Sequence, residues 1–254
     1  MKKYQEKRAA PVLAHPAAQP SNMPAAQHEP PPFKVSASKA SAPTVQKDDK
    51  PAAAAQIGWA ELEPVLKSVP SGVDALGIKS KHQVSVEFSS LTAVASFLPD
   101  TNKCLVNPKL SAKVAASYFI HEMNHAARFH TGQSPKAEDT EQAKFVDTLV
   151  QEEIDGTVKQ FEAALELSPS ADMGLPCETW YRGAYKSTKE KALKESKTEA
   201  EAHQLGLANG KRMVKYLIDP PNNEWPRLAP NTYESYRMYY TREWKSKNKS
   251  KTAL

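Results

Sequence analysis

The sequence predicts an α+β fold, a mostly helical domain with a small antiparallel sheet ahead of its central helix. Three short apolar runs rich in strand-forming residues lie close together at 84–88, 95–98 and 104–106. Beyond them, long stretches poor in Gly and Pro carry apolar residues at helical spacing. About 190 residues follow a Pro-rich N-terminal segment, which is enough for one domain with a sizeable core.

The first 55 residues have a composition that does not favour a packed core. They hold nine of the twenty prolines, no glycine and only two aromatic residues, Tyr4 and Phe33. Such a segment buries too little apolar area to offset the entropy lost on ordering. We therefore expect a disordered Pro/Ala-rich tail over 1–55, a folded domain over 56–244 and a basic tail over 245–254.

The first elements of the domain are delimited by turn-forming residues. Residues 59–69 have helical spacing and end at Pro70. The segment 99–102, Pro-Asp-Thr-Asn, predicts a hairpin turn between the strands at 95–98 and 104–106.

The central helix has clear start and stop signals. Ser111 is suited to be its N-cap, and no Gly or Pro follows until Gly132, a residue suited to a helix C-terminus. Further helices are expected over 140–168, near 188–205, near 211–218 and in the Tyr-rich segment 231–244.

The central helix contains the pattern His-Glu-x-x-His. His121 and His125 lie one turn apart on one helix face, so both imidazoles can reach a single metal ion. Glu122 adjoins the first histidine and can take a proton from a metal-bound water without being a ligand. The alternative is two core histidines with an ion-paired glutamate, but burying these groups without a metal would be costly.

A third ligand is expected in the segment 140–168, because catalytic zinc usually has three protein ligands. Glu153 interrupts an otherwise largely apolar helix face, and zinc would be a partner for its carboxylate. Glu152 is the alternative ligand, and a solvated acidic surface is the alternative for both. Gly156 costs about 1 kcal/mol relative to Ala in a helix, which suggests close approach to another helix. Asp155 is a candidate to orient a ligating imidazole.

Residues 118–132 resemble the active-site helix of zincin metallopeptidases. The metzincin branch would need Gly and His where this chain has Arg128 and Thr131, and His130 is expected to be a surface or capping histidine. The chain is more similar to the gluzincin branch, in which a later helix supplies a glutamate. The run Glu-Ile-Asp-Gly at 153–156 also resembles a Glu-x-Asp-Ala segment of small gluzincin-like peptidases, which puts the ligand at Glu153.

The resemblance implies a zinc metallopeptidase of the metalloendopeptidase type, acting on a peptide or protein. His121, His125 and Glu153 would bind Zn²⁺ and Glu122 would be the catalytic base. An edge strand would pair with the substrate backbone, and a Tyr from 231–244 would steady the oxyanion unless these rings serve only for packing. The alternatives are a basic non-catalytic interaction protein with structural histidines and a zinc hydrolase of a non-peptide amide or cell-wall peptide.

Charge and cysteine content restrict the remaining function classes only weakly. The net charge is +5 and the basic excess gathers at the termini, where it could attract nucleic acid or an anionic membrane. No zinc-finger spacing, RNA-binding signature or phosphate-binding glycine loop accompanies it, so no clear nucleic-acid module is expected. Two cysteines, Cys104 and Cys177, are too few for a disulfide framework.

The N-terminal segment bears on localisation. We find no secretory signal and no run long enough for a membrane span, so the expected location is cytoplasmic or outside by a non-Sec route. Residues 31–36 and 42–47 are similar in composition to the N-termini of bacterial proteins associated with contractile injection systems. That resemblance implies a toxin-like effector whose tail is recognised by a secretion or injection apparatus, and a plain linker is the alternative.

Overall fold

The structure is a computed structural model that describes residues 56–90, 94–221, 226, 228 and 234–249. The described residues all belong to one compact unit, Pro51–Leu254. The predicted tail over 1–55 and the end of the predicted basic tail lie outside the described residues.

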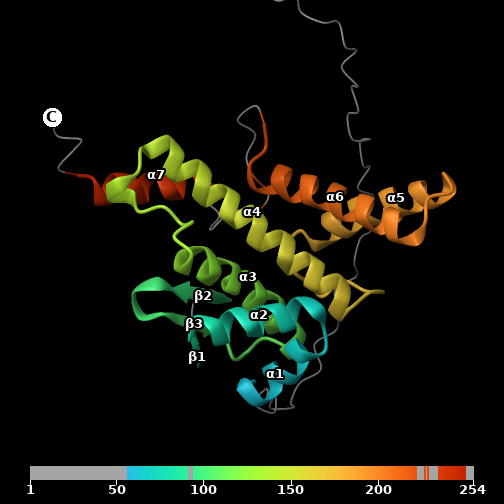
Figure 1. Cartoon of the computed structure of the whole chain (residues 1–254), viewed down its shortest axis with the longest axis horizontal. Coiled ribbons are helices and arrows are strands. Elements are labelled where there is room, and N and C mark those ends of the chain that lie inside the picture. Colours follow the sequence, from blue (N-terminus) through green and yellow to red (C-terminus); the bar gives the residue numbers. More distant parts are fainter. Residues whose placement is uncertain (1–55, 91–93, 222–225, 227, 229–233, 250–254) are drawn as a thin grey trace, which may run out of the picture. The chain divides into compact units, whose positions relative to one another are not determined.

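The described residues form seven α-helices and one three-stranded sheet, which confirms the α+β class (Figure 1). Two short 3₁₀ turns accompany them. The helices are α1 (Trp59–Lys67), α2 (Pro70–Lys81), α3 (Ala112–His130), α4 (Gln142–Leu167), α5 (Glu178–Lys194), α6 (Glu199–Ile218) and α7 (Tyr236–Lys247), and the strands are β1 (Ser85–Phe88), β2 (Ala95–Leu98) and β3 (Lys103–Val106).

The sheet is mixed, so the prediction of a purely antiparallel sheet was wrong. β3 lies in the middle, parallel to β1 and antiparallel to β2. The predicted hairpin between β2 and β3 is present, and Asn102 closes its turn with a left-handed backbone at φ 49°. β1 does not pair with β2, the next strand in the sequence. It pairs with β3 and runs parallel to it. β2 is therefore an edge strand.

Two helix boundaries also differ from the predictions. The chain does not leave helical structure after Pro70, because this proline occupies the first turn of α2, where its missing N–H is no loss. The break in the charged C-terminal helices lies earlier than expected. Ser196 has a positive φ of 62°, and Thr198 then caps α6 through a capping box with Glu201. α6 runs from there to Ile218 without interruption.

α4 is the longest helix among the described residues and lies in the middle of the helix arrangement (Figure 1). It contacts α3 and α2, while α6, α5 and α7 also pack against it. One hydrophobic cluster joins α1, α2, the sheet and α3, and a second joins α4 to α5, α6 and α7. Buried polar and charged side chains gather where α3 meets α4, so this contact is where a site is to be sought. No helix among the described residues is long and apolar enough to cross a membrane.

Candidate metal site

The histidines of the motif are carried by a well-delimited helix. Ser111 caps α3, with its Oγ accepting the Val114 N–H, and Gly132 follows the helix end with φ 71°, both as predicted. His121 and His125 lie one turn apart in the part of α3 that faces α4. His121 is only 8 % exposed, so its imidazole is held within the protein interior.

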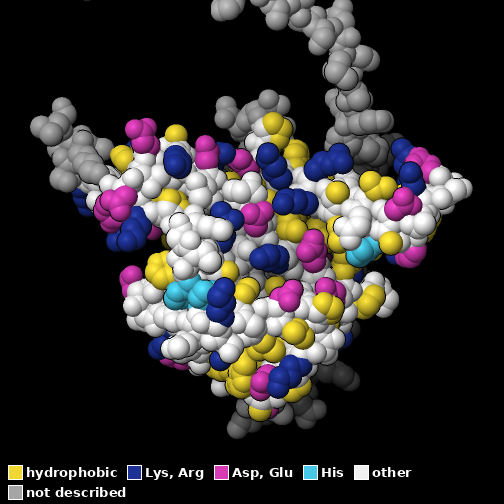
Figure 2. Space-filling model, viewed as in Figure 1, with side chains coloured by type: hydrophobic (Ala, Val, Ile, Leu, Met, Phe, Trp, Pro, Cys, Tyr) yellow, Lys and Arg dark blue, Asp and Glu magenta, His cyan; other side chains and the backbone are white. Residues whose placement is uncertain are grey.

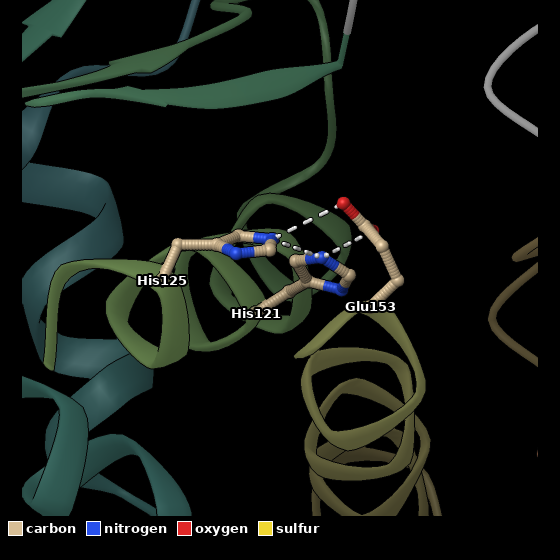
Figure 3. A group of neighbouring side chains, drawn as sticks. All are labelled: His121, His125 and Glu153. Carbon is tan, nitrogen blue, oxygen red and sulfur yellow. Dashed lines mark hydrogen bonds and ion pairs between the residues drawn. The ribbon is translucent and has the colours of Figure 1, made fainter. Parts of the chain in front are cut away.

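Glu153 of α4 meets both histidines (Figure 3). The Nε2 atoms of His121 and His125 are 3.0 Å apart. Glu153 Oε2 lies 3.5 Å from His121 Nε2, and Glu153 Oε1 lies 3.8 Å from His125 Nε2. Among the described residues, this is the group of three such side chains whose candidate ligand atoms all lie within 4.8 Å of one another.

These three side chains fit a zinc ion by spacing and by chemistry. Two ligand atoms bound to one tetrahedral zinc are about 3.3–3.5 Å apart, because each bond is about 2.0–2.2 Å long. The separation of the two nitrogens, 3.0 Å, and that of Glu153 Oε2 from His121 Nε2, 3.5 Å, lie close to that value. Two imidazoles and one carboxylate are also a ligand set that catalytic zinc sites use.

Glu152 contacts the other ring nitrogen of His125 from the one that Glu153 faces. Its Oε1 accepts a hydrogen bond from His125 Nδ1 at 2.8 Å. A carboxylate can only accept, so the proton lies on Nδ1, and in the neutral ring Nε2 keeps a lone pair for a metal. Arg128 Nε lies 3.3 Å from Glu152 Oε2, and the Ser134 hydroxyl donates to the same oxygen at 2.8 Å. Glu152 thus orients an imidazole from outside the three-residue cluster.

His121 is held by packing. A Cβ atom at Gly156 would lie 3.0 Å from both Cε1 and Nε2 of this ring, so only glycine leaves the ring its space. The predicted close helix approach at Gly156 is confirmed. Asp155 does not orient an imidazole, as the sequence had suggested; it accepts a hydrogen bond from Arg128 and ion-pairs with Lys211. Asp155 binds Arg128 through Nη1, whereas Glu152 lies next to Arg128 Nε.

Glu122 is buried beside the cluster and anchored to the sheet. Its Oε2 accepts the backbone N–H of Phe97 at 2.8 Å, and it is 8 % exposed. Phe97 belongs to the edge strand β2, and this N–H points away from the neighbouring β3. The carboxylate therefore links α3 to the outer edge of strand β2.

The electrostatics of the cluster favour a positive charge at its centre. Burial alone would lower the pKa of His125, but the carboxylates of Glu153 and Glu152 outweigh it and raise this pKa to about 9. Burial would raise the pKa of Glu153, yet His125 and His121 lower it to about 2. The Glu153 carboxylate would stabilise either a proton on His125 or a metal cation between the two histidines.

Helix α7 adds two tyrosines that were not singled out from the sequence. The Tyr240 hydroxyl donates to Glu153 Oε1 at 2.5 Å. Tyr236 stacks on Tyr240 with ring centroids 6.3 Å apart. Burial and the nearby charges of Glu153 and Glu122 raise the pKa of Tyr236 well above its usual value, so its hydroxyl stays protonated.

Other candidate residues lie away from the cluster. His130 is at the end of α3, where its ring stacks on His82 and its Nε2 pairs with Asn102 Oδ1 at 2.8 Å. This agrees with its predicted surface position. Cys104 is fully buried in β3 as a free thiol, and burial raises its pKa well above the usual value.

Sequence reasoning missed Glu152 as an orienting group, Arg128 as its support and Tyr240 as a partner of Glu153. One signal was available for Arg128, which lies on α3 one turn beyond Asn124 and His125 and so faces the same acidic helix. No local pattern singles out Tyr240, since 87 residues separate it from Glu153.

Comparison with protein-family models, with curated proteins and with solved structures finds no match. A functional proposal for this chain therefore rests on the geometry and chemistry of the site.

Proposed function

We propose that the protein is a zinc-dependent metallopeptidase in which His121, His125 and Glu153 hold the metal and Glu122 is the general base. The observation that carries this proposal is the convergence of the three side chains on one point, with Glu122 beside them but outside the ligand group. Bound zinc would supply Lewis-acid polarisation of a carbonyl and an activated water.

The surroundings of the ligands support a catalytic role over a purely structural one. Burying several charged groups together contributes little to stability and is often unfavourable compared with apolar packing. Here Glu122, Glu152 and Glu153 are all less than 9 % exposed. Buried titratable groups with displaced pKa values, here His125 and Glu153, are typical of functional sites.

Glu122 has the position that a general base requires. Its Oε2 is held by the Phe97 N–H, which fixes the carboxylate while Oε1 is left to receive a proton from the attacking water. The same carboxyl can then pass that proton to the leaving amine. The base is also protected from bulk water, because its side chain is buried against the sheet.

The edge strand favours a peptide as the substrate. β2 has β3 on one side only, and its outward-facing Phe97 N–H lies at the base itself. An extended peptide can add to such an edge through main-chain groups other than the Phe97 N–H, which Glu122 accepts, and its scissile bond would then lie close to Glu122. By contrast, basic and acidic side chains are interspersed on the face shown in Figure 2, which gives no support there to a nucleic-acid surface.

The replacement Glu122→Gln tests this proposal. Glutamine keeps an oxygen that can accept the Phe97 N–H, but it cannot take a proton. We expect unchanged zinc content and loss of peptide hydrolysis by about two to four orders of magnitude, the usual range for a general base. The measurement is cleavage of a quenched-fluorescence peptide library beside zinc analysis of the same samples. Wild-type rates in the zinc-loaded variant would exclude Glu122 as the base.

A further inference from the structure

Helix α7 reaches the candidate metal site from the far end of the described chain. It packs against α4 and against the 3₁₀ turn Ala137–Asp139. None of its residues is fully buried, but Tyr236, Tyr240 and Trp244 pack partly buried against the second hydrophobic cluster. Polar contacts add to this docking.

Those polar contacts come from Arg237 and Trp244, which lie two turns apart on one face of the helix. Trp244 Nε1 donates to the Thr140 carbonyl at 2.8 Å. Arg237 pairs through Nη1 with Asp147 of α4 at 2.7 Å, and its Nε and Nη2 bind Asp219 after α6. The helix is therefore tied to both the start of α4 and the end of α6.

The docked helix places the Tyr240 hydroxyl against the carboxylate of Glu153. Tyr240 donates to Glu153 Oε1, and its ring packs edge-on against Phe145 with centroids 6.5 Å apart. Glu153 Oε2, which accepts no bond from Tyr240, is the oxygen nearer to a histidine, at 3.5 Å from His121 Nε2. The tyrosine thus selects which carboxylate oxygen remains for the metal.

We propose that Tyr240 is a positioning residue for the metal ligand Glu153, holding Oε1 so that Oε2 coordinates the ion and making α7 an integral part of the metal site. This inference rests on the proposed function, because it assumes that Glu153 binds metal. A ligand carboxylate hydrogen-bonded from outside is better oriented, and loss of such a partner typically costs about 10–100-fold in metal affinity.

The test is the zinc affinity of Tyr240→Phe in the full chain, measured by competition with a chromogenic chelator. Phenylalanine keeps the ring that packs on Phe145 and removes only the hydroxyl. We expect affinity to fall about tenfold or more. The matched control is Tyr239→Phe, the adjacent residue of α7, whose ring lies 5.1 Å from that of Tyr240 and whose hydroxyl makes no hydrogen bond to Glu153; it should bind zinc as the wild type does.

A double-mutant cycle separates positioning from a general structural effect. In a Glu153→Ala background only the two histidines remain as ligands, and adding Tyr240→Phe should change zinc affinity no further. An equal loss in that background, or unchanged affinity in the single variant, would overturn the role of Tyr240. Absence of zinc binding by the wild type would instead overturn the proposed function, and the inference with it.

Discussion

In two helix pairs of this protein, a glycine on one helix makes room for an aromatic ring of the other, but the side chains buried around the contact differ. In the α3–α4 pair, Gly156 makes room for the ring of His121. In the α5–α6 pair, Gly206 and Gly210 make room for the rings of Tyr185 and Tyr181. In both pairs a side chain larger than hydrogen at the glycine would collide with an aromatic ring, so close helix approach by itself does not mark a functional site.

The polarity of the buried side chains distinguishes the two pairs. The α5–α6 pair buries mainly small and apolar side chains, apart from Glu178 at the start of α5. The α3–α4 pair buries a group of polar and charged residues that a stable core does not require. They are His121, Glu122, Asn124, Glu152, Glu153, Thr157 and Gln160. The comparison teaches that buried charge at a helix contact, more than tight packing, points to function.

The largest expected effect on zinc comes from removing a ligand. His121→Ala takes away one of the three proposed ligands, and we expect the variant to lose stoichiometric zinc on dialysis. His203→Ala is the matched control, because this histidine belongs to the other pair and binds the Tyr185 hydroxyl at 2.8 Å. Zinc analysis of both variants measures whether only the α3–α4 pair affects metal binding. Retention of one zinc by His121→Ala would remove this residue from the ligand set.

A smaller loss is expected when the group that orients His125 is weakened. In Glu152→Gln the side chain no longer carries the charge that holds the imidazole and Arg128. We expect zinc affinity to fall about 10–100-fold. Asp155→Asn, which alters the other partner of Arg128, should change affinity much less. Chelator competition measures both, and equal losses would mean that the whole charge network, and not Glu152, orients the ring.

Gly156→Ala should have a still smaller effect on zinc. The added Cβ would lie 3.0 Å from two atoms of the His121 ring, so the ring must shift by a few tenths of an ångström. We expect zinc affinity to fall by about tenfold or less, while the helix itself gains up to about 1 kcal/mol from the better helix former. Titration of zinc and thermal unfolding of the metal-free protein give the two quantities. Unchanged affinity would show that the ring can move freely.

Gly210→Ala should leave zinc affinity unchanged. Its Cβ would come within 2.5 Å of Tyr181 Cε2, in a ring that is fully buried against Phe161. We expect the free energy of unfolding to fall by about 1–3 kcal/mol, the usual cost of overpacking a core. Denaturant unfolding checks this value. A loss of zinc affinity in this variant would break the distinction between the two pairs.

Local signals in the sequence predicted helix α3 and the position of both motif histidines on it. Ser111 and Gly132 are short-range start and stop signals, and the spacing of His121 and His125 follows from helix geometry alone. Glu153 could be named because it interrupts an apolar face, and the structure brings it to both histidines.

What the sequence left open depends on contacts between distant segments. Whether β1 pairs with β2 or β3 is a matter of tertiary packing, so the sheet was predicted to be antiparallel and its parallel β1–β3 pair was not foreseen. Which of the two carboxylates meets both histidines and which binds only His125 Nδ1 depends on how α4 is rotated against α3. Tyr240 reaches the site only because α7 docks on α4, a contact with no periodic signature.

The zinc content of the purified full-length protein, beside that of Glu153→Ala, tests the central claim most directly. After saturation with zinc and dialysis, we expect one zinc per wild-type chain and a marked loss in the variant, because Glu153 is the ligand proposed for α4. A wild-type protein that holds no stoichiometric zinc under these conditions would contradict the assignment of this cluster as a metal site.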